Sequence, residues 1–339
     1  MNSALIAGSL PPGTAYDADI IILAMDRVDE TLEAIASALA QTGISRHVLV
    51  FDQGSTEASL DRLRAAIDGQ SGVGLVRAER NWGVAGGRNR ATALGHGRII
   101  VALDNDAEFG NERTVARAAA RLDAESDLAA IGFRIVIHSS GADDLSSWGY
   151  TSALLPRSAA TFETVTFVGA GHAISRRAWD GCGGYDDRLF FCWEEFDFCL
   201  KAISKGWRMQ YAGDLVVRHK VSPDRRFNWS GNRWFYYVRN RLYIGRKWGS
   251  WPALTPRIMG YLLKGARNGL WSQTLKAVPA AWRLARTTPH STMSSTGSAY
   301  IARNDAAHRG TLRSRLKREV FAALPGHGMK TSAKGAAPH

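Results

Sequence analysis

Cysteine is scarce in this sequence: Cys182, Cys192 and Cys199 are the only three among 339 residues. Their number is odd, and they include no C-x-x-C pair. An odd set of this kind does not suit the disulfide framework of a small secreted domain, and it indicates a reducing cytosol. It also lacks the closely spaced pairs of a zinc site, so we expect buried cysteines that behave as small apolar residues.

Long apolar runs and a basic leader are also missing. Residues 1–13 contain no basic side chain and no long apolar segment, so we expect no signal peptide there. No stretch reaches the roughly 18 apolar residues that are needed to span a bilayer. Hydrophobic residues make up 45% of the chain and charged residues 22%, as in an ordinary globular protein. We therefore expect a folded protein that is soluble or lies on a membrane surface.

Lysine is absent from the first 200 residues, and acidic residues are rare after them. Residues 1–200 hold 17 basic and 27 acidic side chains, a net charge of −10, whereas residues 201–339 hold 26 and 4, a net charge of +22. The overall charge of +12 is therefore the sum of an acidic body and a basic C-terminal part. Such a basic part predicts an anionic partner, which could be phosphate groups, nucleic acid or lipid headgroups.

Short apolar runs alternate with helical patterns through the first 137 residues. Strands are predicted at 19–25, 47–51, 74–77, 98–103 and 128–137, and helices at 29–41, 57–68 and 112–124. A glycine-rich loop and a short helix are predicted at about 81–95. This alternation predicts an α/β fold with a mostly parallel sheet flanked by helices. Further along, the sequence predicts a helix at 194–205, strands at 207–211 and 215–218, and helices after about 230.

Polar clusters follow two of the predicted strands directly. Residues 52–55 follow one and Asp104-Asn105-Asp106 follows another, so both should lie at the carboxyl edge of the sheet and line one cleft. Two carboxylates spaced i and i+2 can hold Mg²⁺ or Mn²⁺, although Asp-rich turns also occur without a metal. Asp52 could bind a nucleotide hydroxyl or base, or it could cap the next helix.

A glycine-rich loop, residues 81–89, opens a predicted helix. Gly86 and Gly87 would let the backbone approach a ligand closely. The loop is not a dinucleotide-binding fingerprint, because no G-x-G-x-x-G follows the first strand, and no Gly-Lys-Ser/Thr of a Walker loop is present.

Three acidic residues, Glu194, Glu195 and Asp197, follow the aromatic run 190–193. Acidic side chains in the first turn of a helix are favourable in any case, because they face the positive end of its dipole. An apolar wall around them would also raise a carboxylate pKa toward the range of a general base. His219 ends another predicted strand and could be a surface histidine or a ligand.

Taken together, these motifs resemble glycosyltransferase family 2, with its GT-A fold, and most of all its bacterial rhamnosyltransferase-like members. The similarity covers roughly residues 18–249 and depends on the order and spacing of several short motifs. They are Asp52-Gln53-Gly54-Ser55-Thr56, Asn81-x-Gly83…Gly86-Gly87-Arg88-Asn89, Asp104-Asn105-Asp106, Gly169-Ala170-Gly171, Gly183-Gly184-Tyr185-Asp186…Phe190-Phe191…Glu194-Glu195-Phe196-Asp197, His219 and Tyr236-Tyr237-Val238-Arg239-Asn240.

The resemblance implies a metal-dependent, inverting transfer of a sugar from a nucleotide diphosphate to a hydroxyl of a glycan or lipid-linked acceptor. Mg²⁺ or Mn²⁺ would be bound by Asp104, Asp106 and His219. Residues implied to bind the nucleotide and the sugar donor are Asp52, Asn81, Gly86, Arg88, Asn89, Asp104 and Arg239. Glu195, or Glu194 beside it, would be the catalytic base.

The sequence departs from the family pattern at three places. Position 195 usually carries Asp, and Gln53 replaces a usual Asn or Asp. The first strand ends in Met25-Asp26-Arg27, where the family usually has a pair of the Tyr-Asn or Thr-Tyr type. The longer Glu side chain leaves both Glu194 and Glu195 as candidates for the base.

We divide the chain into an N-terminal extension at 1–17, a catalytic domain at 18–230, a basic helical region at 231–324 and a tail at 325–339 that we expect to be disordered. Basic residues alternate with tryptophan, tyrosine and leucine from 232 to 286. This pattern is typical of helices on an anionic membrane surface, although such helices could also simply pack on the catalytic domain. No nucleic-acid-binding motif is present. We therefore expect a cytoplasmic protein, or one that is peripheral on the inner membrane.

Two other functions compete with sugar transfer. A nucleotidyltransferase that makes nucleotide sugars could use a similar cleft, but residues 25–29 lack the glycine of its phosphate loop. A non-catalytic membrane-surface protein on the same fold is the third possibility, and the intact Asp104, Asp106 and Glu195 argue against it.

Overall fold

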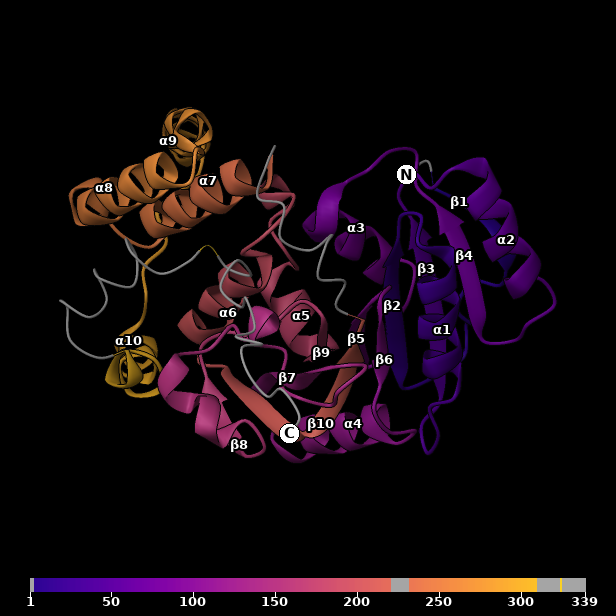
Figure 1. Ribbon diagram of the computed structural model, residues 1–339. Helices are drawn as coiled ribbons and strands as arrows, with labels where there is room; N and C mark the ends of the chain where they lie inside the picture. Colours follow the sequence, from indigo (N-terminus) through magenta and orange to yellow (C-terminus); the bar gives the residue numbers. More distant parts are fainter. Residues whose placement is uncertain (1–2, 221–231, 310–323, 325–339) are drawn as a thin grey trace, which may run out of the picture.

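The computed structural model describes residues 3–220, 232–309 and Leu324. Ten strands form one sheet in this part of the chain, with helices on both faces and a further group of helices to one side (Figure 1). The strands are β1 (Ala4–Gly8), β2 (Ala18–Ala24), β3 (Arg46–Asp52), β4 (Val73–Arg77), β5 (Ile99–Asp104), β6 (Ala107–Phe109), β7 (Leu128–Ile137), β8 (Thr161–Thr164), β9 (Gly171–Ser175) and β10 (Arg208–His219).

The sheet follows the order β1-β4-β3-β2-β5-β9-β7-β10-β6, and β8 also pairs with β10. The pairings give β4, β3, β2, β5, β7 and β10 one direction and β1, β9, β6 and β8 the opposite one. The sheet is therefore mixed, with six of its ten described strands parallel in direction.

The helices are α1 (Val28–Leu39), α2 (Glu57–Ile67), α3 (Gly83–Thr92), α4 (Thr114–Ala124), α5 (Arg176–Cys182), α6 (Glu194–Ser204), α7 (Asn232–Lys247), α8 (Trp251–Arg267), α9 (Trp271–Arg286) and α10 (Ser295–Asn304). Short 3₁₀ turns occur at Leu145–Ser147, Ser152–Arg157, Asp187–Leu189 and Ala306–His308.

Apolar residues on the central strands alternate between the two faces of the sheet. Ile20 and Ile22 belong to the core beneath α1, α2 and α4, whereas Ile21 belongs to the core on the side of α3, α5, α6 and α7. Because successive side chains of a strand point to opposite faces, a continuous apolar run is what a strand covered on both sides requires. This is why the apolar runs in the sequence located the central strands to within one or two residues.

The sequence pattern did not locate four strands, β1, β6, β8 and β9, and β8 has four residues. β1 pairs with β4 at the sheet edge and is half-exposed, β6 has three residues, and β9 lies antiparallel between β5 and β7. Backbone pairing stabilises them without a long apolar run. The predicted strands at 207–211 and 215–218 are one strand, β10, which is interrupted by an irregularity between Ala212 and Val216.

The basic C-terminal helices pack on the catalytic domain through α7. Trp234, Val238 and Leu242 on α7 are fully buried in the core that also contains α6. Within the described residues, no helix is long and apolar enough to cross a membrane. The predicted domain boundary at 230 and the predicted tail at 325–339 lie outside the described residues.

Candidate active site

Two strand ends and the turn between β5 and β6 bring together Asp104, Asp106 and His219. Asp104 is the last residue of β5, His219 is the last residue of β10, and Asp106 precedes β6. The antiparallel register pairs His219 with Ala107, which places the imidazole beside Asp106. One ligand atom from each of the three side chains lies within 4.8 Å of the other two.

Contacts around this cluster orient its ligands. His219 Nε2 lies 3.1 Å from Asp106 Oδ1, and His219 Nδ1 lies 3.1 Å from Asp144 Oδ2. An acidic partner on the second ring nitrogen is typical of metal-binding histidines, because it holds the ring in position. Two carboxylates and an imidazole form a ligand set that suits Mn²⁺ and Mg²⁺ when substrate oxygens complete it. The residues present therefore fit the predicted cation site.

Arg88 connects this cluster to the acidic end of α6. Its guanidinium is buried and lies 3.1 Å from Asp104 Oδ1, 3.0 Å from Glu195 Oε1 and 2.7 Å from the Gly169 carbonyl oxygen. Burial would by itself lower the pKa of Arg88, but nearby acidic groups, including Asp104 and Glu195, raise it overall. Arg88 is thus a fixed positive charge between the predicted cation site and the predicted base.

Glu194 and Glu195 occupy different surroundings. Glu194 is buried, and among the described residues its Oε2 has no hydrogen-bond partner. Burial raises its pKa well above the usual range, and repulsion by Glu195 adds to the shift. Burial also raises the pKa of Glu195, while the charge of Arg88 opposes that rise. Glu195 lines a cavity, so only its carboxylate combines a charged partner with access to a ligand.

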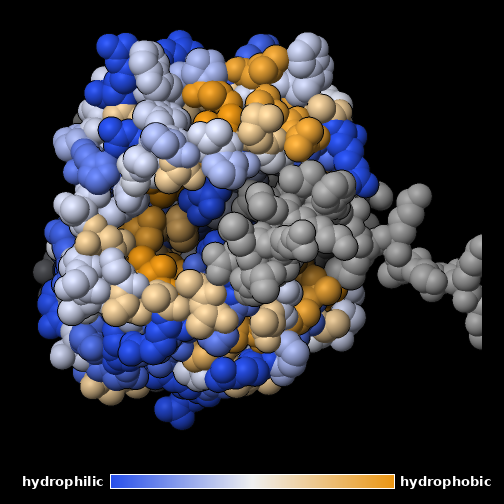
Figure 2. Space-filling model, turned by 90° about the vertical axis from the view of Figure 1, so that its left-hand side faces the viewer, coloured by the Kyte–Doolittle hydropathy of each residue, from blue (hydrophilic) through white to orange (hydrophobic). Residues whose placement is uncertain are grey.

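The cavity beside Glu195 has a volume of about 620 Å³. It lies between the catalytic domain and α7 and α8, and residues 304–309 close one side. Figure 2 shows this face of the molecule hollowed below the exposed hydrophobic residues of α8 and α9. A cavity of this size can enclose a small ligand, as binding sites commonly do.

A strained turn leads into α6. Phe190, Cys192 and Trp193 all have positive φ angles, at 62°, 69° and 74°. Non-glycine residues adopt this conformation at an energetic cost, and they keep it only where the surrounding structure imposes it.

Asn240 on α7 holds this turn in place. Asn240 is fully buried, and its Nδ2 donates to the carbonyl oxygens of Leu189, Phe191 and Cys192 at 2.8, 2.8 and 2.9 Å. The indole N–H of Trp193 in turn donates to the Tyr237 carbonyl oxygen at 3.0 Å. Helix α7 therefore determines the position of the turn that carries Glu194 and Glu195.

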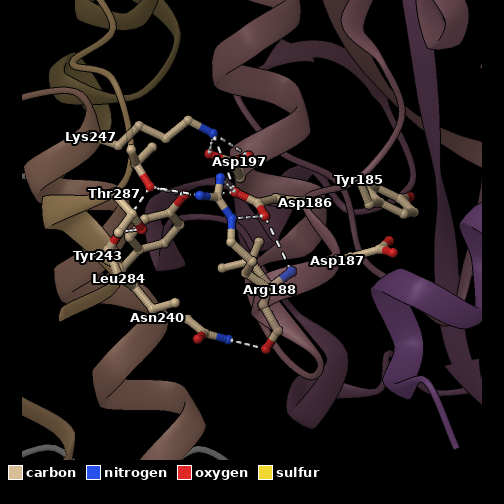
Figure 3. A network of polar contacts seen from close by, with 12 residues as sticks. Tyr185, Asp186, Asp187, Arg188, Asp197, Asn240, Tyr243, Lys247, Leu284 and Thr287 are labelled. Carbon is tan, nitrogen blue, oxygen red and sulfur yellow. Dashed lines mark hydrogen bonds and ion pairs between the residues drawn. The ribbon is translucent and has the colours of Figure 1, made fainter. Parts of the chain in front are cut away.

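A second polar network joins the same turn to the far end of α7 (Figure 3). Asp186 accepts from Arg188 and from the Tyr243 hydroxyl, both at 2.7 Å, and Lys247 donates to Asp197 at 2.8 Å. Burial would raise the pKa of Asp186, but these hydrogen bonds and the cationic neighbours lower it to about 2. The network fastens α7 to both ends of the acidic segment.

The predicted nucleotide residue Asp52 is fully buried at the end of β3. Its carboxylate accepts from the backbone N–H groups of Gly54 and Ser55, at 3.3 and 3.2 Å. The neighbouring Asp26, at the end of the first predicted strand, accepts from Thr56 N at 3.0 Å. Asp52 therefore organises the turn before α2, whether or not it also contacts a nucleotide.

The glycine-rich loop is held by side chains from neighbouring segments. Gln53 donates to the Gly83 carbonyl oxygen at 3.1 Å and accepts from Trp82 N at 3.0 Å. Asn81 accepts from Gly83 N at 2.7 Å. A Cβ atom on Gly86 would lie 3.1 Å from the Cβ of Trp82, so this position needs a small residue for helix packing.

Two residues that were predicted to bind the sugar donor, Asn89 and Arg239, contact a neighbouring segment of the protein. Asn89 donates to the Tyr185 carbonyl oxygen and accepts from Tyr185 N, each at 2.9 Å. Arg239 donates to the carbonyl oxygens of Arg188 and Leu189, at 2.7 and 3.0 Å. Both side chains hold the segment 185–189, so their described contacts are structural and do not include the Asp104–Asp106–His219 cluster.

Arg27 and Asp144 belong to the site but did not emerge as candidates from the sequence. Arg27 Nη1 lies 2.5 Å from Asp106 Oδ2, and Asp144 supports His219. Arg27 has a positive φ of 53°, directly after β2. Asp144 lies in the irregular segment 138–168, whose composition predicts loops and short edge strands. The departure from the family pattern at residues 25–27 was the one signal that could have identified Arg27.

Comparison with known proteins indicates the class of protein to which this site belongs. The family described as Glycosyl transferase family 2 matches residues 19–183. This region of the chain matches a glycosyltransferase family 2 domain, and the described part of the chain has the GT-A fold.

Two curated relatives come from Rhizobium meliloti (strain 1021). One is the succinoglycan biosynthesis protein ExoU, 43% identical over 93 residues, and the other is the succinoglycan biosynthesis protein ExoO, 36% identical over 90 residues. The matched segments cover 27% and 26% of this chain and 27% and 25% of the relatives, about a quarter of each protein.

Two solved structures share the fold. The mannosyltransferase PcManGT from Pyrobaculum calidifontis, in complex with GDP-Man and Mn²⁺, has a TM-score of 0.51 at 17% identity, covering 90% of this chain and 79% of its own. GalNAc-T7, with UDP, GalNAc and Mn²⁺, has a TM-score of 0.59 at 15% identity, covering 82% and 59%. These levels of identity establish the fold alone.

Proposed function

We propose that this glycosyltransferase is an inverting, metal-dependent enzyme that moves a hexose-type sugar from a nucleoside diphosphate to a hydroxyl of a glycan or lipid-linked acceptor. The observation that supports this most is the buried Arg88, which lies within 3.1 Å of Asp104 in the cation site and of Glu195 on the cavity wall. One rigid cation thus fixes the separation of the two groups that the reaction needs.

The reaction requires one carboxylate. Glu195 accepts the proton of the acceptor hydroxyl, and the oxygen forms a bond to the anomeric carbon of the sugar. The bond between that carbon and the diphosphate oxygen breaks on the opposite side, and its electron pair leaves with the diphosphate. Attack from the opposite face inverts the configuration, and no second carboxylate is needed because the diphosphate leaves without a proton.

Asp104, Asp106 and His219 would hold Mn²⁺ or Mg²⁺. A bound divalent cation supplies Lewis-acid stabilisation of the negative charge on a departing diphosphate. Arg27 adds a protein cation at the same place, since its guanidinium contacts Asp106. The two solved neighbours carry Mn²⁺ with a nucleotide or a nucleotide sugar, in keeping with this assignment.

Glu195 is the better candidate for the base. It lines the cavity, and its partner Arg88 favours the deprotonated carboxylate that a base needs. Glu194 is buried, its Oε2 has no hydrogen-bond partner among the described residues, and it is not among the residues that line the cavity. We assign Glu194 a role in shaping the electrostatics around Glu195.

The glycan assignment follows the names of the relatives, which are succinoglycan biosynthesis proteins. We infer that this chain also acts in polysaccharide biosynthesis, in the cytoplasm or peripherally on the inner membrane.

The surface of helices α8 and α9 supports the proposal that the protein binds an anionic membrane surface. Large apolar side chains there, Met259, Leu263, Trp271, Leu275 and Trp282, are 46–59% exposed beside basic residues. Exposed apolar residues rimmed by cations suit a lipid headgroup layer.

Release of nucleoside diphosphate tests the proposal. The purified chain is incubated with a panel of nucleotide sugars and with Mn²⁺, Mg²⁺ or EDTA. We expect slow hydrolysis of one sugar donor that requires the cation, with inversion at the anomeric carbon seen by NMR. Undiminished turnover in EDTA, or retained configuration at the anomeric carbon, would contradict the proposal.

Co-sedimentation with anionic and neutral liposomes tests the proposed binding to a membrane surface. Equal binding to both kinds of liposome contradicts an electrostatic contribution.

A further inference from the structure

Arg27 contacts the carboxylate of Asp106, which also belongs to the predicted cation site. Arg27 Nη1 lies 2.5 Å from Asp106 Oδ2, and His219 Nε2 lies 3.1 Å from Oδ1 of the same carboxylate. Within the described ranges, Asp106 is the one side chain with which the Arg27 guanidinium pairs. A cation that binds Asp106 through Oδ2 must therefore share this oxygen with a guanidinium.

The turn after β2 determines where Arg27 lies. Asp26 and Arg27 both have positive φ angles, at 54° and 53°, which non-glycine residues adopt at an energetic cost. Contacts with the turn before α2 hold this conformation. Asp26 N donates to the Ser55 hydroxyl at 2.7 Å, and the Asp26 carboxylate accepts from Thr56 N at 3.0 Å. The backbone of Arg27 is thus held in place, whereas its side chain is 34% exposed and can rotate away from Asp106.

Charge repulsion limits what Asp106 can bind at the same time. Two positive groups at one carboxylate oxygen repel each other, and Asp106 is buried, so water screens this repulsion only weakly. A guanidinium that leaves Asp106 needs another anionic partner, and phosphate oxygens match its planar fork of N–H donors. The diphosphate of a nucleotide sugar has such oxygens.

We propose that Arg27 competes with the divalent cation for Asp106, and that the displaced guanidinium binds the diphosphate of the sugar donor. Arg27 then lowers the affinity of the site for a cation alone and raises its affinity for a nucleoside diphosphate together with a cation. Such coupling is reciprocal, so cation and donor each strengthen the binding of the other. The inference rests on the proposed function, because it needs both a cation and a diphosphate at this site.

Binding of Mn²⁺ to the full chain without nucleotide tests the competition. The electron paramagnetic resonance signal of free Mn²⁺ gives the dissociation constant. We expect R27Q to bind Mn²⁺ about tenfold more tightly than the wild type, because the variant lacks the competing charge. R62Q is the matched control, since Arg62 pairs with Asp29 at 2.5 Å on the surface and the change removes the same charge. Unchanged or weaker Mn²⁺ binding in R27Q, or an equal gain in R62Q, overturns the inference.

Calorimetric titration with UDP, GDP and dTDP at saturating Mg²⁺ tests the contact with the diphosphate. R27Q should bind the preferred nucleoside diphosphate about tenfold more weakly than the wild type, as the loss of a charge-assisted hydrogen bond predicts. R27K keeps the charge but not the fork, so it should keep the Mn²⁺ affinity of the wild type and bind the diphosphate more weakly. Equal affinity in R27Q and the wild type, or no binding of any of the three, overturns the inference.

The opposite signs of the two effects of R27Q separate this role from that of a structural ion pair, whose loss would weaken the binding of both ligands. Thermal unfolding checks that each variant folds, and R27K provides the diphosphate measurement in case R27Q does not fold.

The donor assay distinguishes failure of this inference from failure of the proposed function. If the wild type hydrolyses a sugar donor but R27Q does not change the two affinities in opposite directions, the inference about Arg27 fails alone. If no donor in the panel is hydrolysed, the proposed function fails.

Discussion

The two halves of the candidate site are built in different ways. Asp104 and His219 end β5 and β10, so the backbone pairing of a ten-stranded sheet fixes the cation cluster. Glu195 begins α6 after a turn with three positive φ angles, and that turn depends on side chains of α7. The proposed cation site is supported by the backbone of the sheet, whereas the proposed base is supported by side chains from the basic C-terminal region.

Because of this difference, we expect substitutions in the two parts of the site to have different effects. A site fixed by strand pairing tolerates change in its neighbours, because many backbone hydrogen bonds share the constraint. A turn held in a strained conformation by one buried amide depends on that amide. Substitutions in the sheet cluster should therefore act on chemistry alone, and substitutions on α7 should act on both geometry and stability.

The largest effect should come from Asp106→Asn. Removal of this charge weakens the cation site while Arg27 and His219 retain an oxygen partner, so we expect turnover to fall by about a thousandfold with the fold intact. The measurement is the release of nucleoside diphosphate over a range of Mn²⁺ concentrations. Asp61→Asn, an exposed carboxylate on α2 paired with Arg64, is the matched control and should leave turnover unchanged. Equal turnover in both variants would contradict the cation assignment.

Glu195→Gln should reduce transfer by about a hundredfold or more, since a general base contributes roughly that much. Glu194→Gln should have a smaller effect. In the wild type the base must be deprotonated, so the rate should fall as pH drops through the pKa of Glu195, which burial raises above its usual range. The pH dependence of kcat measures this limb. A limb that persists in Glu195→Gln would exclude Glu195 as its source.

Asn240→Ala tests whether α7 supports the base from outside the catalytic domain. The change removes the Asn240 donor from three carbonyl oxygens, of which that of Leu189 keeps Arg239 as a donor. We therefore expect the free energy of unfolding to fall by about 1–3 kcal/mol and kcat to fall about tenfold. Asn268→Ala is the matched control, because Asn268 donates to one carbonyl oxygen at the end of α8. If kcat falls by the same factor in both variants, then the conformation of the turn does not depend on Asn240.

Asp186→Asn should have the smallest effect on turnover and a distinct effect on stability. The folded pKa of about 2 lies below the usual 3.8, so the charged form stabilises the fold above about pH 4, and this stabilisation disappears as pH falls from about 4 to 2. At neutral pH the free energy of unfolding of the wild type should exceed that of the variant by about 2 kcal/mol. Urea unfolding at pH 7 and pH 2.5 measures the difference. A difference of equal size at both pH values would show that the Asp186 charge is not its cause.

Patterns along the chain predicted much of the fold. The apolar runs located β2, β3, β5 and β7 because a strand buried on both faces cannot be built from anything else. The apolar runs did not locate β1, β6, β8 and β9, since hydrogen bonds between backbones stabilise short or edge strands without a marked composition.

The candidate site, too, could be predicted only in part from the sequence. The sequence by itself determined which side chains are candidates: two carboxylates at the end of β5 and just after it, a histidine at the end of β10 and two glutamates behind an aromatic run. Only the tertiary structure decided which glutamate faces the cavity, that Arg88 links the base to the cation site, and that Arg239 and Asn89 hold a turn. The reason is physical: the sequence gives the type of each side chain, but folding decides its partner, which can be more than 100 positions away, as Glu195 is from Arg88 and His219 from Asp106.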